Sequence, residues 1–212
     1  MIKINKSKEP IAWTEKKSTP GFTEYEPISE LRNALLEEQG YICAYCMRRI
    51  PVKDTNIDAT SKIEHLKSRE DRADLQLDYN NMVICCPGNM DNEPHCDNLK
   101  GRNSITFNPF TDNLQNTIKY KSKDGNIYST NNIWNEEINN MLNLNHSYSK
   151  INRKKALDGI IDTLNSKGWN RGSLANQLDI WSNLDAKGKL KPYCGIVIWY
   201  LQKGLKQKHT AI

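Results

Sequence analysis

The spacing of the cysteines between residues 43 and 101 constrains the fold of this chain more than any other feature. Cys43 and Cys46 are separated by two residues, so that one turn can present both sulfurs to a tetrahedral ion. Further cysteines follow at Cys85, Cys86 and Cys96. A segment rich in Cys, Asn and Asp, with no long periodic runs, is typical of a small motif in which a metal ion replaces part of the hydrophobic core. The sequence therefore predicts a zinc-stabilised unit.

The expected ligands of this structural zinc ion are Cys43, Cys46, Cys86 and Cys96. Cys85 is interpreted as a core residue that points inward beside Val83, but it remains an alternative to Cys86. His95 is likewise an alternative to Cys96 as the fourth ligand. Buried thiols without any metal are the competing interpretation of the whole cluster. Cys194 lies in an expected helix and is assigned to the core.

The absence of apolar targeting or membrane segments in the sequence indicates the compartment in which the cysteines are expected. The N-terminal residues lack the apolar segment of a signal peptide, and the longest apolar run, residues 196–201, is too short to cross a membrane. We therefore expect a cytoplasmic protein whose cysteines stay reduced and which does not associate with membranes.

The net charge is +5. Residues 147–212 hold 12 Lys and Arg against 4 Asp and Glu, or +8, which leaves −3 for residues 1–146. A basic C-terminal third suits a polyanion such as nucleic acid, although a solvated helical surface would look the same.

A second group of residues lies between the cysteines and suggests catalysis. Glu64 and His65 place a carboxylate that can bind a metal ion beside an imidazole that can take a proton from water. Asn81 can orient His65 or hold a loop through its amide. Asp97 adds an oxygen ligand where a helix is expected to begin. Each residue alone is common in structural roles, but their order within the cysteine frame favours metal-assisted cleavage of a phosphodiester.

These residues resemble the HNH endonucleases that carry a zinc-stapled ββα-metal motif. The resemblance rests on Cys43-Ala44-Tyr45-Cys46, Ile63-Glu64-His65, Tyr79-Asn80-Asn81-Met82-Val83, Cys86-Pro87 and His95-Cys96-Asp97-Asn98-Leu99-Lys100-Gly101. Weaker similarities outside residues 41–101 extend it to the PtuB nuclease subunits of Septu-type and retron-associated anti-phage systems. They are Glu9-Pro10, Leu36-Glu37-Glu38-Gln39, the Asp124-Gly125 hairpin, Leu142-Asn143-Leu144-Asn145 and Arg153.

The resemblance implies a role for each matching residue. His65 would be the general base, and Asn81 the structural asparagine in the middle of the motif. Glu64 stands where many HNH enzymes have a metal-binding Asp, and Asp97 where the family commonly has Asn or His. Both replacements keep a hard oxygen, which suits Mg²⁺ or Mn²⁺ as the catalytic ion. Whether Asp97 or Asn98 binds this ion stays open, and the wide loop from Cys86 to Cys96 is unlike the compact HNH proteins.

The expected fold class is α+β, with a ββα-metal motif preceded by a helix and followed by a β-hairpin and a helical C-terminal region. The expected parts are residues 1–40 (N-terminal arm and helix), 41–103 (nuclease core) and 104–212 (hairpin and helices), packed as one compact unit. Residues 1–26 are polar and are expected to be extended. A helix is expected from Pro27 to Gln39, capped by Ser29.

The C-terminal region carries the signals of one hairpin and several helices. Strands are expected at Thr117–Tyr120 and Asn126–Ser129, joined by a turn at Asp124-Gly125. Apolar periodicity then predicts one helix through Ile133 and Leu142, and a second through Ile151 and Leu164 that ends at Gly168. It predicts a third that Ser173 caps and a fourth that begins at Pro192 and runs to Leu205.

The resemblance also implies partners. The chain has no GxxxxGK[ST] sequence, as expected of a nuclease subunit governed by a separate ATPase that resembles ABC and SMC ATPases (PtuA-type). In retron-associated systems a reverse transcriptase and its RNA–DNA product would be further partners. Two alternatives remain: a stand-alone restriction-type HNH enzyme, and a non-catalytic zinc module that binds nucleic acid or protein. The first should carry a sequence-reading element, and none is evident. The second has no need of a base beside a hard-metal site.

Overall fold

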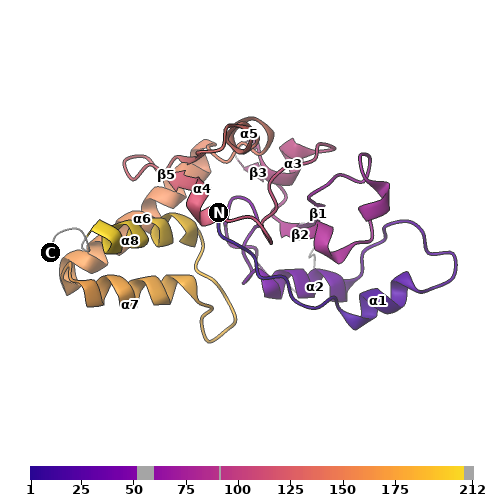
Figure 1. Ribbon diagram of the computed structural model, residues 1–212, viewed down its shortest axis with the longest axis horizontal. Helices are drawn as coiled ribbons and strands as arrows, with labels where there is room; N and C mark the ends of the chain where they lie inside the picture. Colours follow the sequence, from indigo (N-terminus) through magenta and orange to yellow (C-terminus); the bar gives the residue numbers. More distant parts are fainter. Residues whose placement is uncertain (52–59, 91, 208–212) are drawn as a thin grey trace.

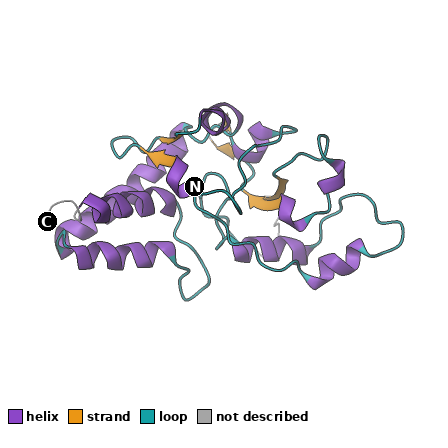
Figure 2. Cartoon of the chain, viewed as in Figure 1, coloured by secondary structure: helices purple, strands orange, loops and turns teal. Residues whose placement is uncertain are grey.

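The computed structural model describes residues 1–51, 60–90 and 92–207 (Figure 1). Helices and short antiparallel strand pairs alternate along these residues, so the α+β class is confirmed (Figure 2). The α-helices are α1 (Ile11–Lys17), α2 (Ser29–Glu38), α3 (Cys96–Lys100), α4 (Leu114–Thr117), α5 (Asn132–Glu136), α6 (Ser147–Lys167), α7 (Arg171–Ser182) and α8 (Cys194–Gln207). The strands are β1 (Lys62–His65), β2 (Met82–Cys85), β3 (Asn89–Met90), β4 (Glu93–Pro94), β5 (Ile118–Tyr120) and β6 (Ile127–Ser129). Single turns of other helix types are η2 (Ala73–Leu75), η3 (Tyr79–Asn81) and η4 (Glu137–Met141).

The N-terminal segment is not simply an extended arm, and that prediction is wrong. Residues 11–17 form α1, which buries Trp13 completely. The indole ring of Trp13 meets Phe22 and Tyr25 edge to face, and its N–H donates to the carbonyl of Leu77 at 3.2 Å. Because the burial of Trp13 depends on a loop about sixty residues further along the chain, local periodicity does not reveal this helix.

Helix α2 lies within the predicted range, but the predicted cap is wrong. Ser29 is the first helical residue, and Ile28, whose side chain cannot accept a hydrogen bond, is at the N-cap position. The Ser29 hydroxyl instead donates to Glu30 at 3.0 Å. The apolar face is as expected, since Leu31, Leu35 and Leu36 are buried.

Two strands and a helix follow one another between residues 62 and 100. β1 and β2 pair antiparallel, with Ile63 opposite Ile84 and His65 opposite Met82. The small β3–β4 pair lies in the segment between β2 and α3, which accounts for the long spacing between Cys86 and Cys96. The ammonium group of Lys100 in α3 donates to the carbonyl of His65 at 2.9 Å. This bond fixes α3 to the end of β1.

The predicted hairpin is present within one residue of its expected bounds. β5 pairs antiparallel with β6, and Tyr120 is opposite Ile127. Gly125 in the connection adopts a φ of 73°, which glycine accepts without strain, and the Asp124 carboxylate accepts the N–H of Asn126 at 3.0 Å. The Asp-Gly signal therefore marks the turn correctly.

The C-terminal region is helical as expected, but two helix starts differ from the prediction. Asn170, not Ser173, caps α7, and its side chain accepts the N–H of Ser173. α8 begins at Cys194 instead of Pro192, because the N–H of Tyr193 bonds the carbonyl of Met47 at 2.8 Å and holds Tyr193 at a φ of 57°. The first predicted helix is α5 continued by the π-helical turn η4. Gly168 ends α6 as expected.

One buried apolar cluster extends from the cysteine-rich segment into the C-terminal helices. Its members include Leu35, Cys96, Leu144, Leu164 and Leu201, which come from widely separated parts of the chain. The helices beyond residue 129 therefore complete the same core that surrounds the cysteines. Among the residues described, no helix is long and apolar enough to cross a membrane.

Candidate metal centre and the His65 cluster

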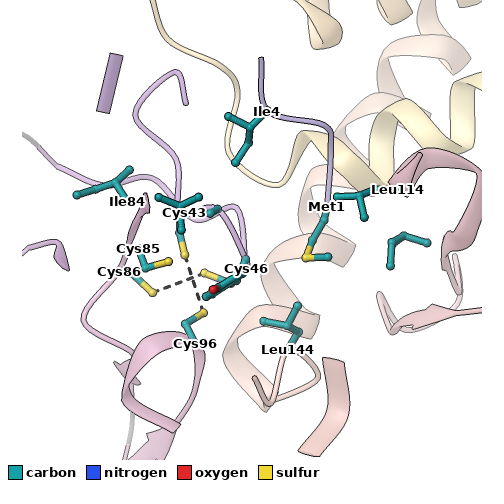
Figure 3. Close-up of a cluster of buried hydrophobic side chains, with 14 of the residues drawn as sticks. Met1, Ile4, Cys43, Cys46, Ile84, Cys85, Cys86, Cys96, Leu114 and Leu144 are labelled. Atoms are coloured by element: carbon teal, nitrogen blue, oxygen red, sulfur yellow. Dashed lines mark hydrogen bonds between the residues drawn. The ribbon is translucent and has the colours of Figure 1, made fainter. Parts of the chain in front are cut away.

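The sulfur atoms of Cys43, Cys46, Cys86 and Cys96 converge in the interior of the protein (Figure 3). All four sulfurs lie within 4.8 Å of one another, with 3.9 Å between those of Cys43 and Cys96 and 3.7 Å between those of Cys46 and Cys86. Sulfurs that surround a tetrahedral zinc ion are separated by about 3.8 Å, because each Zn–S bond is about 2.3 Å long. The four cysteines could therefore hold a metal ion such as zinc.

Separate backbone elements bring these sulfurs together. The turn that carries Cys43 and Cys46 is closed by a hydrogen bond from the Met47 N–H to the Cys43 carbonyl at 3.0 Å, and the Ala44 N–H ties it to the carbonyl of Ile84 at 3.1 Å. Cys86 directly follows β2. Cys96 begins α3, and its N–H bonds the carbonyl of Leu142 at 2.9 Å. Strand, turn and helix thus meet at one point.

The two alternative ligands lie beside this group and not within it. Cys85 is buried in β2 as part of the apolar core. Its sulfur is close to those of Cys43 and Cys86 (Figure 3). The Nε2 atom of His95 is 3.7 Å from the Cys86 sulfur, while its Nδ1 atom donates to the carbonyl of Glu93 at 3.0 Å. His95 therefore contacts one member of the cysteine group from outside.

The protonation of the thiols reflects their crowding. Burial raises the pKa of Cys46 and of Cys96 well above the usual range. Burial acts in the same direction on Cys43, but hydrogen bonds from the neighbouring thiols hold the pKa of Cys43 well below its usual value. The cluster thus stabilises a thiolate at Cys43, and thiolates are the form in which cysteine binds metal ions.

His65 lies at the end of β1 with its ring in a defined orientation. Its Nε2 atom is 3.0 Å from the carbonyl oxygen of Gln76. A carbonyl can only accept, so Nε2 carries the proton and Nδ1 keeps its lone pair. Burial lowers the pKa of His65 to about 4, and the positive charges of Arg69 and Lys100 contribute. The imidazole is therefore neutral near pH 7, with Nδ1 able to accept a proton.

Asn81 holds the loop that orients His65. Its side-chain oxygen accepts the N–H of Lys67 at 2.8 Å, and its amide N–H groups donate to the carbonyls of Lys67 and Leu75 at 2.9 and 3.2 Å. Leu75 directly precedes Gln76, whose carbonyl accepts from His65. Of the two roles considered for Asn81, the contacts favour holding a loop, and the orientation of His65 follows from it.

Glu64 points away from the His65 ring, because successive side chains of a strand lie on opposite faces. Its carboxylate is 2.5 Å from the ammonium group of Lys100 and accepts a hydrogen bond from the Tyr45 hydroxyl at 3.3 Å. Burial raises the pKa of Glu64 to about 8, and a hydrogen bond with Asp97 adds to this, while Lys100 acts in the opposite direction. Two carboxylates therefore crowd one place, where an additional cation would favour their ionised forms.

Asp97 and Asn98 lie at the start of α3 with different exposure. The Asp97 carboxylate is 3.3 Å from the ammonium group of Lys62, and the Asp97 side chain is 17% exposed. Asn98 is exposed and its Cβ packs close to Gly88. Among the residues described, the cysteines form the only group of three or more Cys, His, Asp or Glu that converges on one point. Glu64 and Asp97 lie outside this group, and their carboxylates are paired with the ammonium groups of Lys100 and Lys62.

Sequence reasoning missed three residues of this cluster. Lys100 is almost completely buried and pairs with Glu64 of β1, a contact between separate elements that no local pattern indicates. Tyr25 meets the His65 ring edge to face with 4.6 Å between the ring centres. The guanidinium of Arg69 lies 5.0 Å from the centre of the Tyr25 ring. No local pattern places Tyr25 beside His65, because the contact depends on how residues 11–28 fold back.

Comparison with known proteins adds no relative, since no protein-family model matches this chain and no curated protein matches it.

Proposed function

We propose that this chain is a metal-dependent HNH endonuclease that hydrolyses phosphodiester bonds in nucleic acid. The observation that carries the proposal is the fixed ring of His65: its Nε2–H is bound to the carbonyl of Gln76, so that Nδ1 is the nitrogen that keeps a lone pair. An imidazole held in one orientation, with one unprotonated nitrogen, can serve as the base that activates water.

Each residue of the cluster has a distinct part in the proposed reaction. Nδ1 of His65 accepts the proton of the attacking water. Glu64 and Asp97 hold the catalytic divalent cation, with Asn98 as the alternative second ligand. Bound Mg²⁺ or Mn²⁺ would stabilise the charge on the scissile phosphate and on the leaving oxygen. Asn81 acts as a positioning residue through the loop 66–78.

The four cysteines would stabilise the proposed site from the interior of the protein. With zinc bound to Cys43, Cys46, Cys86 and Cys96, the end of β2 and the first residue of α3 are fixed to one turn. Asp97 directly follows Cys96, so the zinc ion would set the position of the carboxylate. In the proposed enzyme the zinc is structural, and the catalytic ion is a second, exchangeable metal.

Metal-dependent cleavage is the direct test of this function. The chain, which we expect to be weakly active or inactive alone, is incubated by itself and together with the partner described below, with single- and double-stranded DNA and RNA and with and without Mg²⁺ or Mn²⁺. We expect cleavage of at least one substrate that requires the added ion while the zinc content stays constant. Absence of cleavage with every substrate, in the presence of the partner described below, would leave the non-catalytic zinc module as the better explanation.

Metal titration distinguishes the two candidate ligands on α3. Asp97→Ala should raise the Mg²⁺ concentration that gives half-maximal cleavage, because the variant loses one of two carboxylate ligands. Asn98→Ala is the matched control on the same helix turn and should leave this concentration close to that of the wild type. The opposite pattern would transfer the role to Asn98.

We further propose that the nuclease works in an anti-phage complex with an ATPase subunit that resembles ABC and SMC ATPases. Ile133, Ile151, Ile180 and Leu184 in the helical region are large apolar residues that lie exposed, and each is a candidate contact for the ATPase. Truncation after Ser129 would remove part of the core, so point variants are the better test. Ile180→Asp and Leu184→Asp should abolish co-purification with the ATPase, whereas Lys123→Asp, at an exposed position in the turn between β5 and β6, should not. A chain that purifies alone and cleaves at full rate would instead be a stand-alone enzyme.

A further inference from the structure

The surface around the C-terminal half of α8 is hollowed in two adjoining places. The larger hollow, of about 650 Å³, is lined by α8, by Gln115 and Asn116 of α4 and by Lys119 of β5. The smaller hollow, of about 350 Å³, is lined by α8 together with Trp169 and Leu174. Lys203 lines both hollows, so they form one surface. α8 lies on the left of the view in Figure 1 and the β1–β2 pair on the right, and neither hollow is lined by a residue of β1 or β2. This surface is therefore distinct from the His65 cluster.

The charge of this surface has a single sign. Lys119 of β5 and Lys203 and Lys206 of α8 line the larger hollow, and among the described residues neither hollow is lined by an Asp or a Glu. Gln115 and Asn116 add side-chain amides at one edge. The ammonium groups of Lys119 and Lys203 complement a polyanion.

Three aromatic rings lie on the same surface as these lysines. Trp199 lies in the larger hollow, where the Lys203 ammonium is 5.7 Å from the centre of its ring. Trp169 and Tyr200 lie in the smaller one, 6.3 Å apart between ring centres, and Trp169 is 40% exposed. Ammonium groups that contact phosphates, together with rings on which bases stack, are the features by which proteins hold single strands. A duplex keeps its base faces covered, and an acidic peptide has no use for three rings.

We propose that this surface, formed by Lys119, Trp169, Trp199, Tyr200, Lys203 and Lys206, binds single-stranded nucleic acid. Phosphates contact the lysines, and a base stacks on Trp169, the exposed ring of the three. The proposal does not depend on the nuclease activity, because the surface is separate from His65 and binding is measured without added divalent metal.

Binding of a short fluorescein-labelled oligothymidylate to the full-length, zinc-containing chain tests the proposal by fluorescence anisotropy. The variant Lys119→Ala/Lys203→Ala should bind several-fold more weakly, and its log Kd should depend less steeply on log salt concentration, by about 1.4, since each lost phosphate contact removes about 0.7 for a single strand. The control Lys155→Ala/Lys187→Ala makes the same charge change on exposed residues elsewhere and should match the wild type in both quantities.

A separate variant examines stacking. Trp169→Leu should weaken binding by roughly 5- to 150-fold, which corresponds to the stacking energy of one base, and should leave the salt dependence unchanged. Circular dichroism confirms that each variant is folded. Failure of the wild type to bind oligothymidylate, equal loss in the two double variants, or equally effective competition by polyglutamate would overturn the proposal. A chain that binds as expected but cleaves nothing would refute only the nuclease function.

Discussion

The ammonium group of Lys100 lies 2.5 Å from a carboxylate oxygen of Glu64, and both side chains are buried, at 1% and 6% exposure. The same ammonium donates to the carbonyl of His65 at 2.9 Å. One side chain of α3 thus contacts two consecutive residues of β1. It fixes the distance between the strand that carries the proposed base and the helix that carries Asp97.

Removal of this ammonium should destabilise the protein strongly. Lys100→Met removes the cation that holds the pKa of Glu64 down, so above pH 8, where Glu64 is ionised, a buried carboxylate is left without a partner, and the loss of one partner of a buried ion pair costs about 3–5 kcal/mol. Glu64→Gln in the same chain removes the unpaired charge. The double variant Lys100→Met/Glu64→Gln should therefore recover most of the lost stability in urea unfolding. Equal stability of the single and double variants would show that the pair is not an important contact.

Asn81 is expected to stabilise the loop of residues 66–78 and to have no effect on zinc binding. Asn81→Ala leaves the backbone groups of Lys67 and Leu75 without partners, which costs about 1–3 kcal/mol for each buried group that water does not reach. We expect faster hydrogen exchange in residues 66–78 and slower cleavage at unchanged zinc content. Asn80→Ala, at the exposed neighbouring position, is the control and should behave as the wild type. Unchanged exchange in the Asn81 variant would argue against the loop-holding role.

One zinc ion per chain should be found by elemental analysis of the purified protein. Cys43→Ser/Cys46→Ser should lose it and unfold the region around β1, β2 and α3, because the free energy of zinc binding contributes to folding. Cys85→Ala is the matched control, since it removes a buried cysteine beside the group and should keep the zinc. Full folding of the double variant without zinc would mean that the thiols are merely core residues.

Stability at low pH should depend on His146. Burial lowers the pKa of His146 to about 4 from its usual value of 6.5, and the adjacent His95 contributes. The unfolded chain takes up this proton as the pH falls below 6.5, whereas the folded chain stays neutral until about 4, so the stabilisation is complete above 6.5 and is lost between these values.

Loss of zinc at low pH lowers the stability of the wild type and of the variant His146→Gln alike. The difference between the two proteins therefore reports on His146. The difference in unfolding free energy between wild type and variant should decrease by up to about 3 kcal/mol as the pH falls from neutral to acid, at about 1.4 kcal/mol per pKa unit. Urea unfolding over this pH range measures it. Parallel pH curves for the two proteins would contradict the prediction.

The features that could be predicted from the sequence depend on the spacing of residues that are close together in the chain. The interval between Cys43 and Cys46 and the Asp124-Gly125 turn act within a few residues, and the structure has the sulfur cluster and the hairpin at the expected places. Helix periodicity likewise located α6, since the residues that mark it lie one turn apart and Gly168 ends it.

Contacts between distant segments could not be predicted in this way. Helix α1 forms around Trp13, which needs Leu77, and the start of α8 is delayed by a bond between Tyr193 and Met47. The partner of His65 is a backbone carbonyl, and any residue can provide one, so the side chain at position 76 gives no signal. The same holds for Lys100, whose burial depends on the position of α3 against β1.

The cleavage rate of His65→Ala, measured with Mg²⁺ on the best wild-type substrate, tests the central claim most directly. Zinc content and the circular dichroism spectrum are recorded on the same sample, and His146→Gln, which replaces another buried histidine, is the control. We predict that the His65 variant keeps its zinc and its fold and cleaves about 10²- to 10⁴-fold more slowly, as expected when a general base is lost. A folded, zinc-containing His65→Ala protein that cleaves at the wild-type rate would contradict the account.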